Sequence, residues 1–450
     1  MGGTTLDILV DIAQAAVRAA TAAGADWADA ICASGRSVEV GVEKSSIRQC
    51  EAERSSGVGV RAYVDGAVGL ASSQSLDSEQ VAACARQAVT LARAAHRDPD
   101  FVALPQPSPV QRVPELFDED VAGLDSTRIV QWCQEGIEEA RVVNPKVALS
   151  GRATLAEGEY GLASSTGVAL SNRGTFIQIF FMAVVRDGDD VGSYFEYDVA
   201  RRLEDFVPAG VAAQATLQAD KFLGARHIKT ARLPVVMGPL SAGSFLTAPI
   251  EAADAESVQR ERSYMVGKAG EQIGSEAITI IEDPFVPAGV SSQGWDGEGV
   301  PKQRRALIDA GVLTTYLHNS YTANKAGVDN TAHAARSGYS PSVGISTSNL
   351  LIEPGELTEA ELIAEIDEGL YINAAQVEPD PASGDLSVTV DFGFKIEDGE
   401  LAYPVKNTMI GGHILGLLQQ VDAVSSDYRE EPGSIIPSVR LSAVQIIGAE

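Results

Sequence analysis

The sequence predicts an α+β protein with two domains, an N-terminal antiparallel sheet with helices over residues 1–226 and a β-rich C-terminal domain over residues 227–450. A chain of 450 residues is long enough for two domains with sizeable cores. Short β-rich runs separated by Gly, Ser and Asn turns recur in both halves, while fewer segments show helical periodicity. The boundary is placed near residue 227, between an alanine-rich helical segment and a buried strand.

The N-terminal domain is predicted to pack helices against an antiparallel meander. Apolar residues recur at helical spacing from Leu6 to Val17, and Gly24 lies where a glycine would end that helix. Asp65-Gly66 is a hairpin-type turn, and the prolines between residues 98 and 120 predict an extended connector. The other predicted helices span 81–91, 125–140 and 208–223, and the strands span 28–32, 38–42, 58–64, 68–71, 148–156, 160–164, 168–171 and 175–186.

The C-terminal domain is predicted to consist mainly of strands. Asp398-Gly399 has the composition of a tight hairpin turn. Helices are predicted over 245–258, 359–366 and 412–421. The predicted strands span 233–237, 278–281, 306–308, 312–317, 386–390, 392–396 and 402–405.

Composition excludes several classes of protein. A net charge of −28 argues against binding to nucleic acid, because a phosphate backbone is held by Lys and Arg. The chain has no apolar run long enough to span a membrane and no basic leader, so we expect a cytoplasmic protein. The four cysteines lack metal-binding spacing and are expected to be reduced thiols.

The segment 233–272 is the most informative for function. A zinc protease that carries its metal on one helix needs two His on one face, with a Glu between them as general base. The predicted helix 245–258 offers Thr247, Glu251 and further acidic residues, but no His or Cys. None of the five histidines pairs with another at helical spacing, so we expect no helix-borne zinc site.

Four other polar residues are candidates for a substrate cleft. Asp296 and Glu298 could act as a general acid/base pair if they shared a cleft, but a glycine-rich turn explains them as well. His413 follows two glycines at a predicted helix start, where an anion could bind, and His318 lies at a predicted strand end. For both histidines a structural role is the simpler alternative.

Four segments, in this order, resemble the TldD/PmbA family, also called the modulator of DNA gyrase family. They are SSGVGVRAYVDGAVGLASS (55–73), RRLEDFVPAGVAAQATLQADKFLGARHIKTARLPVVMGP (201–239), WDGEGVPKQRRALIDAGVLTTYLHNSYTANKAG (295–327) and FKIEDGELAYPVKNTMIGG (394–412). The resemblance extends over nearly the whole chain.

This resemblance implies a role for the chain. TldD-like subunits carry HExxxH on the helix that corresponds to residues 247–252, and a later Cys that corresponds to the region 430–437. Both regions lack these ligands here. The chain is therefore similar to the TldE/PmbA subunits, which hold no zinc and pair with a zinc-containing TldD-like subunit in a cytoplasmic metalloprotease. In the family, that complex is associated with trimming unfolded peptides, including leader peptides, so the resemblance implies a peptide substrate.

Two departures from the family pattern leave alternatives open. A Ser-Arg-Gly-Ala run expected after Gly384-Asp385 is replaced by LSVTVDFGF, and Pro249 falls inside the predicted helix. A stand-alone enzyme, repurposed as a homodimer for peptide or metabolite tailoring, is the main alternative. A regulatory module that binds gyrase is a third hypothesis.

Overall fold

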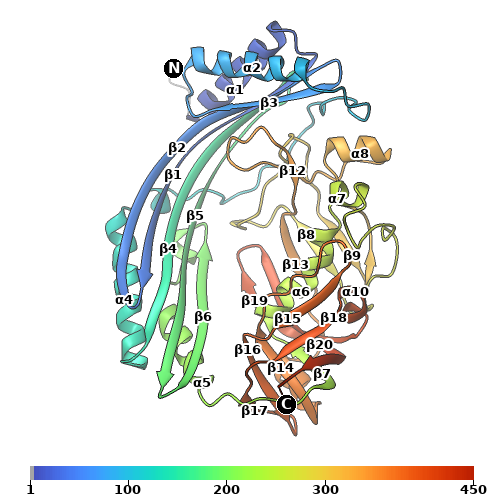
Figure 1. The fold of residues 1–450 in the computed structure, drawn as a ribbon. Coiled ribbons are helices and arrows are strands. Elements are labelled where there is room, and N and C mark those ends of the chain that lie inside the picture. The colour runs from blue at the N-terminus through green and yellow to red at the C-terminus, as the bar shows by residue number, and fades with distance from the viewer. Residues whose placement is uncertain (1–4, 450) are drawn as a thin grey trace.

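The computed structural model describes residues 5–449, and its N-terminal part is a six-stranded antiparallel sheet in the order β3-β2-β1-β4-β5-β6 (Figure 1). The strands are long and bend, and the C-terminal part lies on the concave side of the bend (Figure 1). The strands are β1 (Trp27–Glu43), β2 (Ser46–Val64), β3 (Ala67–Ser73), β4 (Ala148–Ser164), β5 (Ala169–Asp187) and β6 (Asp190–Ala200).

Helices cover one face of this sheet at both of its ends. Even-numbered residues of β1, such as Cys32 and Val40, pack into the helices. Because side chains alternate along a strand, odd-numbered residues such as Ile31 face the C-terminal part, where Ile31 packs near Trp295. The covering helices are α1 (Thr5–Ala22), α2 (Ser78–Ala94), α4 (Ser126–Val143) and α5 (Val211–Lys221), and α3 (Glu119–Ala122) and the 3-10 turn η1 (Leu203–Asp205) lie in the connections.

The C-terminal part is built on a mixed sheet with the path β10-β9-β8-β13-β20-β7-β14-β16-β17. Its long C-terminal strand β20 pairs with four other strands, and the pairs β7–β14 and β13–β20 are parallel. The strands are β7 (Ala231–Met237), β8 (Ile280–Asp283), β9 (Arg305–Asp309), β10 (Val312–Leu313), β13 (Asn349–Ile352), β14 (Glu368–Ala374), β15 (Asp385–Thr389), β16 (Phe392–Glu397), β17 (Glu400–Pro404), β18 (Met409–His413), β19 (Val421–Glu431) and β20 (Ser434–Ile447).

The apolar helix α6 (Pro239–Ala252) packs on this sheet and supplies Phe245, Leu246 and Ile250 to its core. Aromatic rings join the two parts of the molecule at one end, where the Tyr194 and Phe392 ring centroids are 4.9 Å apart. The remaining elements are short: α7 (Ala255–Gln259), α8 (Ser320–Ala326), α9 (Glu359–Ala364), α10 (Ile414–Leu418), β11 (Ala334–Ala335) and β12 (Gly344–Ile345).

The predicted α+β class is confirmed, as are both Asp-Gly turns, whose Asp65 and Asp398 have positive φ. The N-terminal runs are longer than predicted, since 28–32 and 38–42 belong to the single strand β1. The sequence patterns missed eight strands, namely β6, β11, β12, β13, β14, β18, β19 and β20.

Three C-terminal boundaries were wrong. The helix predicted over 245–258 begins at Pro239, ends at Ala252, and restarts as α7 after Asp254, whose carboxylate accepts a hydrogen bond from the Glu256 N–H at 2.9 Å. The helix predicted over 412–421 is only α10, because β18 continues to His413 and β19 begins at Val421. The strand predicted over 312–317 is limited to β10.

Candidate functional site

Thr247 and Glu251 lie one turn apart on α6, at the surface of the C-terminal part. The Thr247 hydroxyl donates to the Gly243 carbonyl at 3.0 Å, so it is engaged within its own helix. Glu251 is exposed, and partial burial and the charge of Glu378 raise the pKa of its carboxyl. The Tyr264 hydroxyl donates to the Ala248 carbonyl at 3.0 Å and brings its ring beside this face.

His413 belongs to the same surface group, which we call the α6 face group: Thr247, Glu251, Tyr264 and His413. The His413 and Tyr264 ring centroids are 6.5 Å apart. Both rings also pack closely against the backbone of Gly384, where there is no room for a side chain. His413 is the N-cap of α10, and its Nδ1 accepts a hydrogen bond from the Leu415 N–H at 3.3 Å. Only Nε2 of this exposed ring remains for a ligand.

The α6 face group does not fit a zinc site. One carboxylate and one ring nitrogen are fewer donors than the three protein ligands that a catalytic zinc requires, and a helix-bonded hydroxyl adds none. Among residues 5–449, no group of three or more His, Cys, Asp and Glu side chains is placed to hold a metal ion.

Asp296 and Glu298 lie far inside the molecule, in a loop that closes on itself through a bridge between Trp295 and Pro301. The Asp296 carboxylate accepts backbone N–H bonds from Glu298 and Val300, both at 2.9 Å, and from Ala334 at 3.1 Å. Burial, followed by the charge of Glu298, raises the pKa of Asp296 to about 7. The loop therefore uses its carboxylates to hold backbone donors.

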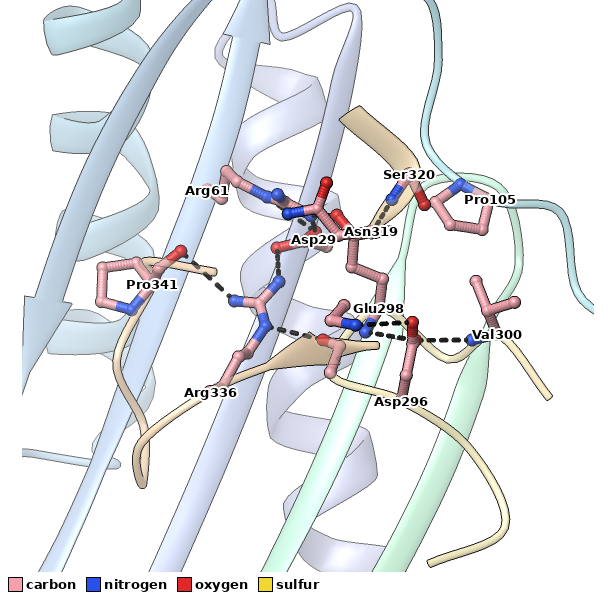
Figure 2. A network of polar contacts seen from close by, with 12 residues as sticks. Asp29, Arg61, Pro105, Asp296, Glu298, Val300, Asn319, Ser320, Arg336 and Pro341 are labelled. Atoms are coloured by element: carbon pink, nitrogen blue, oxygen red, sulfur yellow. Dashed lines mark hydrogen bonds and ion pairs between the residues drawn. The ribbon is translucent and has the colours of Figure 1, made fainter. Parts of the chain in front are cut away.

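Glu298 completes a buried charge network between the two parts of the molecule (Figure 2). The Arg61 guanidinium on β2 binds Asp29 on β1 and also Glu298, at 2.8 Å. Arg336 binds the second Asp29 oxygen at 2.8 Å and donates to the Gly297 carbonyl at 2.7 Å. We call Asp29, Arg61, Glu298 and Arg336 the charge network.

His318 is buried beside a second histidine that the sequence patterns did not single out. Its Nδ1 lies 3.2 Å from the Thr322 hydroxyl, and burial lowers its pKa. The neighbouring His333 connects Glu282, at 2.9 Å from Nε2, with Thr331, at 2.8 Å from Nδ1. His333 has both ring nitrogens engaged within the protein, and His318 is buried with its Nδ1 beside Thr322, which favours a structural role for both.

A cleft of about 620 Å³ opens between the concave sheet face and the C-terminal loops. Its floor is a row of three glycines that pair across β1, β4 and β5, namely Gly35, Gly158 and Gly174. Trp295 and Lys302 border it from the C-terminal side. The sheet backbone is open at Gly35 and Gly158, while the Arg201 side chain lies over Gly174.

The predicted site residues thus fall into separate places. Thr247, Glu251 and His413 lie on one surface. Asp296 and Glu298 lie in the buried loop between Trp295 and Pro301, which we call the interdomain loop, and Asp296 also borders the cleft. Apart from Asp296, the residues that line this cleft were not predicted from the sequence. The charge network did have a signal in the sequence, because Asp29 and Arg61 are the single charged residues of the apolar runs 28–32 and 58–64.

The fold is that of an α+β protein built of two packed parts, and this chain belongs to the PmbA/TldD family. Family models match three consecutive stretches: domain 1 over residues 28–92, the central domain over 119–223, and the C-terminal domain over 230–448, each described as PmbA/TldA metallopeptidase.

Individual relatives agree with this assignment. A metalloprotease of Methanothermobacter thermautotrophicus is 31% identical over 282 residues, an alignment that spans 61% of each chain. Metalloprotease PmbA of Escherichia coli O157:H7 is 25% identical over 439 residues, covering 94% of this chain and 92% of PmbA. The crystal structure of TldE from Thermococcus kodakarensis superposes with a TM-score of 0.89 at 26% identity, covering 97% and 100% of the two chains.

No helix in the described part of the chain combines the length and the apolar character needed to cross a membrane.

Proposed function

We propose that this chain is a zinc-free subunit of the TldE/PmbA type, which pairs with a TldD-like catalytic subunit and binds the extended peptide that the complex trims. The observation that supports this most is the α6 face. Thr247 and Glu251 occupy the helix that corresponds to HExxxH in TldD-like subunits, and α6 contains neither His nor Cys. The zinc and its general base would belong to the partner.

The interdomain cleft supports the peptide-binding part of the proposal. At Gly35 and Gly158 a ligand backbone could approach the sheet closely, because no side chain covers these two glycines, whereas the Arg201 side chain lies over Gly174. Trp295 and Tyr160 stand beside the cleft with ring centroids 5.3 Å apart and offer apolar area to side chains. Such a site suits an extended chain of varied sequence.

The test is peptide turnover by the purified chain, by the TldD-like protein encoded nearest to it, and by their mixture. We expect a stable complex of the two proteins and turnover of an unfolded peptide only in the mixture. A TldD-like variant with Gln in place of the HExxxH glutamate should still form the complex but lose turnover. Turnover by this chain alone would contradict the proposal and support the stand-alone enzyme.

A further inference from the structure

Lys302 borders the interdomain cleft without an anionic partner of its own. Its backbone N–H is fixed by the Gly294 carbonyl at 3.1 Å, which holds the residue at the base of the interdomain loop. Its ammonium takes part in none of the hydrogen bonds or ion pairs found between described side chains. Burial lowers the pKa of Lys302, although the charges of Glu282 and Asp296 counteract this effect.

Those two carboxylates are already committed elsewhere. Glu282 accepts hydrogen bonds from His333 and from the backbone and hydroxyl of Ser348, the latter two at 2.7 and 2.8 Å. Asp296 accepts hydrogen bonds from the backbone N–H groups of Glu298 and Val300 in its own loop and of Ala334 on β11. The three donors of the Lys302 ammonium therefore remain for a group that enters the cleft.

A second cation, Arg201, adds positive charge to the same cleft. Its guanidinium donates to four backbone carbonyls, those of Gly289 at 2.8 Å, Val290 at 2.6 Å, Thr175 at 3.2 Å and Leu116 at 3.3 Å. Carbonyls satisfy its donors but do not neutralise its charge. Arg201 therefore makes the electrostatic potential in the cleft more positive, whereas Lys302 offers hydrogen-bond donors that are still free.

The acidic residues along the cleft do not cancel these cations. Glu157 and Glu159 border the cleft, but they pair across the strands with Arg36 and Ser34, even-numbered residues of β1. Even-numbered positions face the helix-covered side, and there Glu157 binds Arg36 at 3.1 Å. Their carboxylates therefore point away from the cleft.

We propose that this cleft is a carboxylate-binding subsite for peptides, in which the Lys302 ammonium binds the carboxylate while the peptide backbone lies over Gly35 and Gly158. This inference rests on the proposed function, because it takes the ligand to be a peptide. The carboxylate is the C-terminal group of the peptide or an Asp or Glu side chain, and both offer the same acceptor chemistry.

The test measures binding of fluorescent hexapeptides to the full chain by anisotropy. One peptide is prepared with a C-terminal acid and with a C-terminal amide, and a second amidated pair carries an internal Glu or Gln. The wild type is expected to prefer the carboxylate form of at least one pair by about tenfold, the effect of one charge-assisted hydrogen bond. The pair that shows the preference identifies the source of the carboxylate.

Lys302→Met should abolish this preference, and Lys302→Arg should retain it. Arg304→Met, a change two residues away at an exposed side chain, is the matched control and should behave as the wild type. A Cβ at Gly158 would meet no atom within 4 Å, so Gly158→Val should fold normally while weakening binding of acid and amide alike.

The outcomes separate this inference from the proposed function. Equal affinity for acid and amide in both pairs, or a preference that persists in Lys302→Met, overturns the carboxylate subsite but leaves peptide binding intact. Binding of none of the peptides, by the chain alone or in its complex, contradicts the proposed function itself.

Discussion

The charge network and the α6 face group hold similar side chains in opposite surroundings. In the network, Asp29 and Glu298 are 3% and 5% exposed, and each has fixed cationic or backbone partners. On α6, Glu251 is exposed and has a raised pKa. A buried charged group has to keep its partners within the protein, because an unpaired buried charge is costly in free energy. An exposed charged group is hydrated and can bind a ligand.

Arg61→Ala should have the largest effect on stability. It leaves Asp29 and Glu298 buried without their shared cation, a loss of about 3–5 kcal/mol in the free energy of unfolding. Urea denaturation monitored by Trp fluorescence measures it. Arg304→Ala, which removes a largely exposed ion pair with Asp283, should cost less than about 1 kcal/mol. Equal losses in the two variants would show that the network does not hold the two parts together.

Acid should weaken the buried His333–Glu282 pair. Burial raises the pKa of Glu282, but the hydrogen bond with His333 and the charge of Lys302 outweigh burial and bring it to about 2. The ionised form then stabilises the fold by roughly 3 kcal/mol above pH 4.5, and this stability is lost as the pH falls toward 2. Urea denaturation between pH 6 and pH 3 should show a shallower decline for Glu282→Gln than for the wild type. An unchanged decline would contradict this account, and the exposed Glu276→Gln serves as control.

Gly59→Ala should cost about 1–3 kcal/mol, since its new Cβ would overlap the Tyr339 carbonyl and force the loop at 338–341 off β2. Thermal unfolding measures the loss, and altered Trp fluorescence would report a disturbed cleft. Gly158→Ala is a matched strand glycine with open space around its Cβ. Equal unfolding temperatures for Gly59→Ala and Gly158→Ala would contradict the close packing of this loop on β2.

Glu251→Gln should have the smallest effect, within about 0.5 kcal/mol, because the side chain is exposed and lacks a fixed ionic partner among the described residues. The unfolding temperature of Glu251→Gln should be compared with that of Glu298→Gln. The same change at Glu298 weakens a buried ion pair with Arg61 and should therefore destabilise the protein more. A loss at Glu251 as large as that at Glu298 would remove the distinction between the two regions.

Local patterns in the sequence were sufficient for the class of fold and for turns such as Asp65-Gly66, where steric preference acts within a few residues. They were insufficient for β20, whose four pairings depend on segments distant in the chain, and for β6, where Glu196 and Asp198 interrupt an apolar pattern. Helix α6 was misplaced because Pro239, its first residue, reads as a breaker when its position is unknown.

For the site, too, the sequence predicted only what depends on residues close together in the chain. Thr247 and Glu251 could be placed on one helix face from spacing alone. The glycine row and the unpaired Lys302 could not, because Gly35, Gly158 and Gly174 become neighbours only through strand register, and the missing partner of a lysine is a property of the folded surroundings.

The zinc content of the purified proteins shows whether this chain holds a metal ion of its own or leaves it to its partner. The chain alone and its complex with the TldD-like subunit would be dialysed against the same metal-free buffer and analysed by mass spectrometry for bound metal. We expect zinc in the complex, in proportion to the TldD-like subunit, and none retained by this chain. Stoichiometric zinc in this chain alone would contradict this expectation.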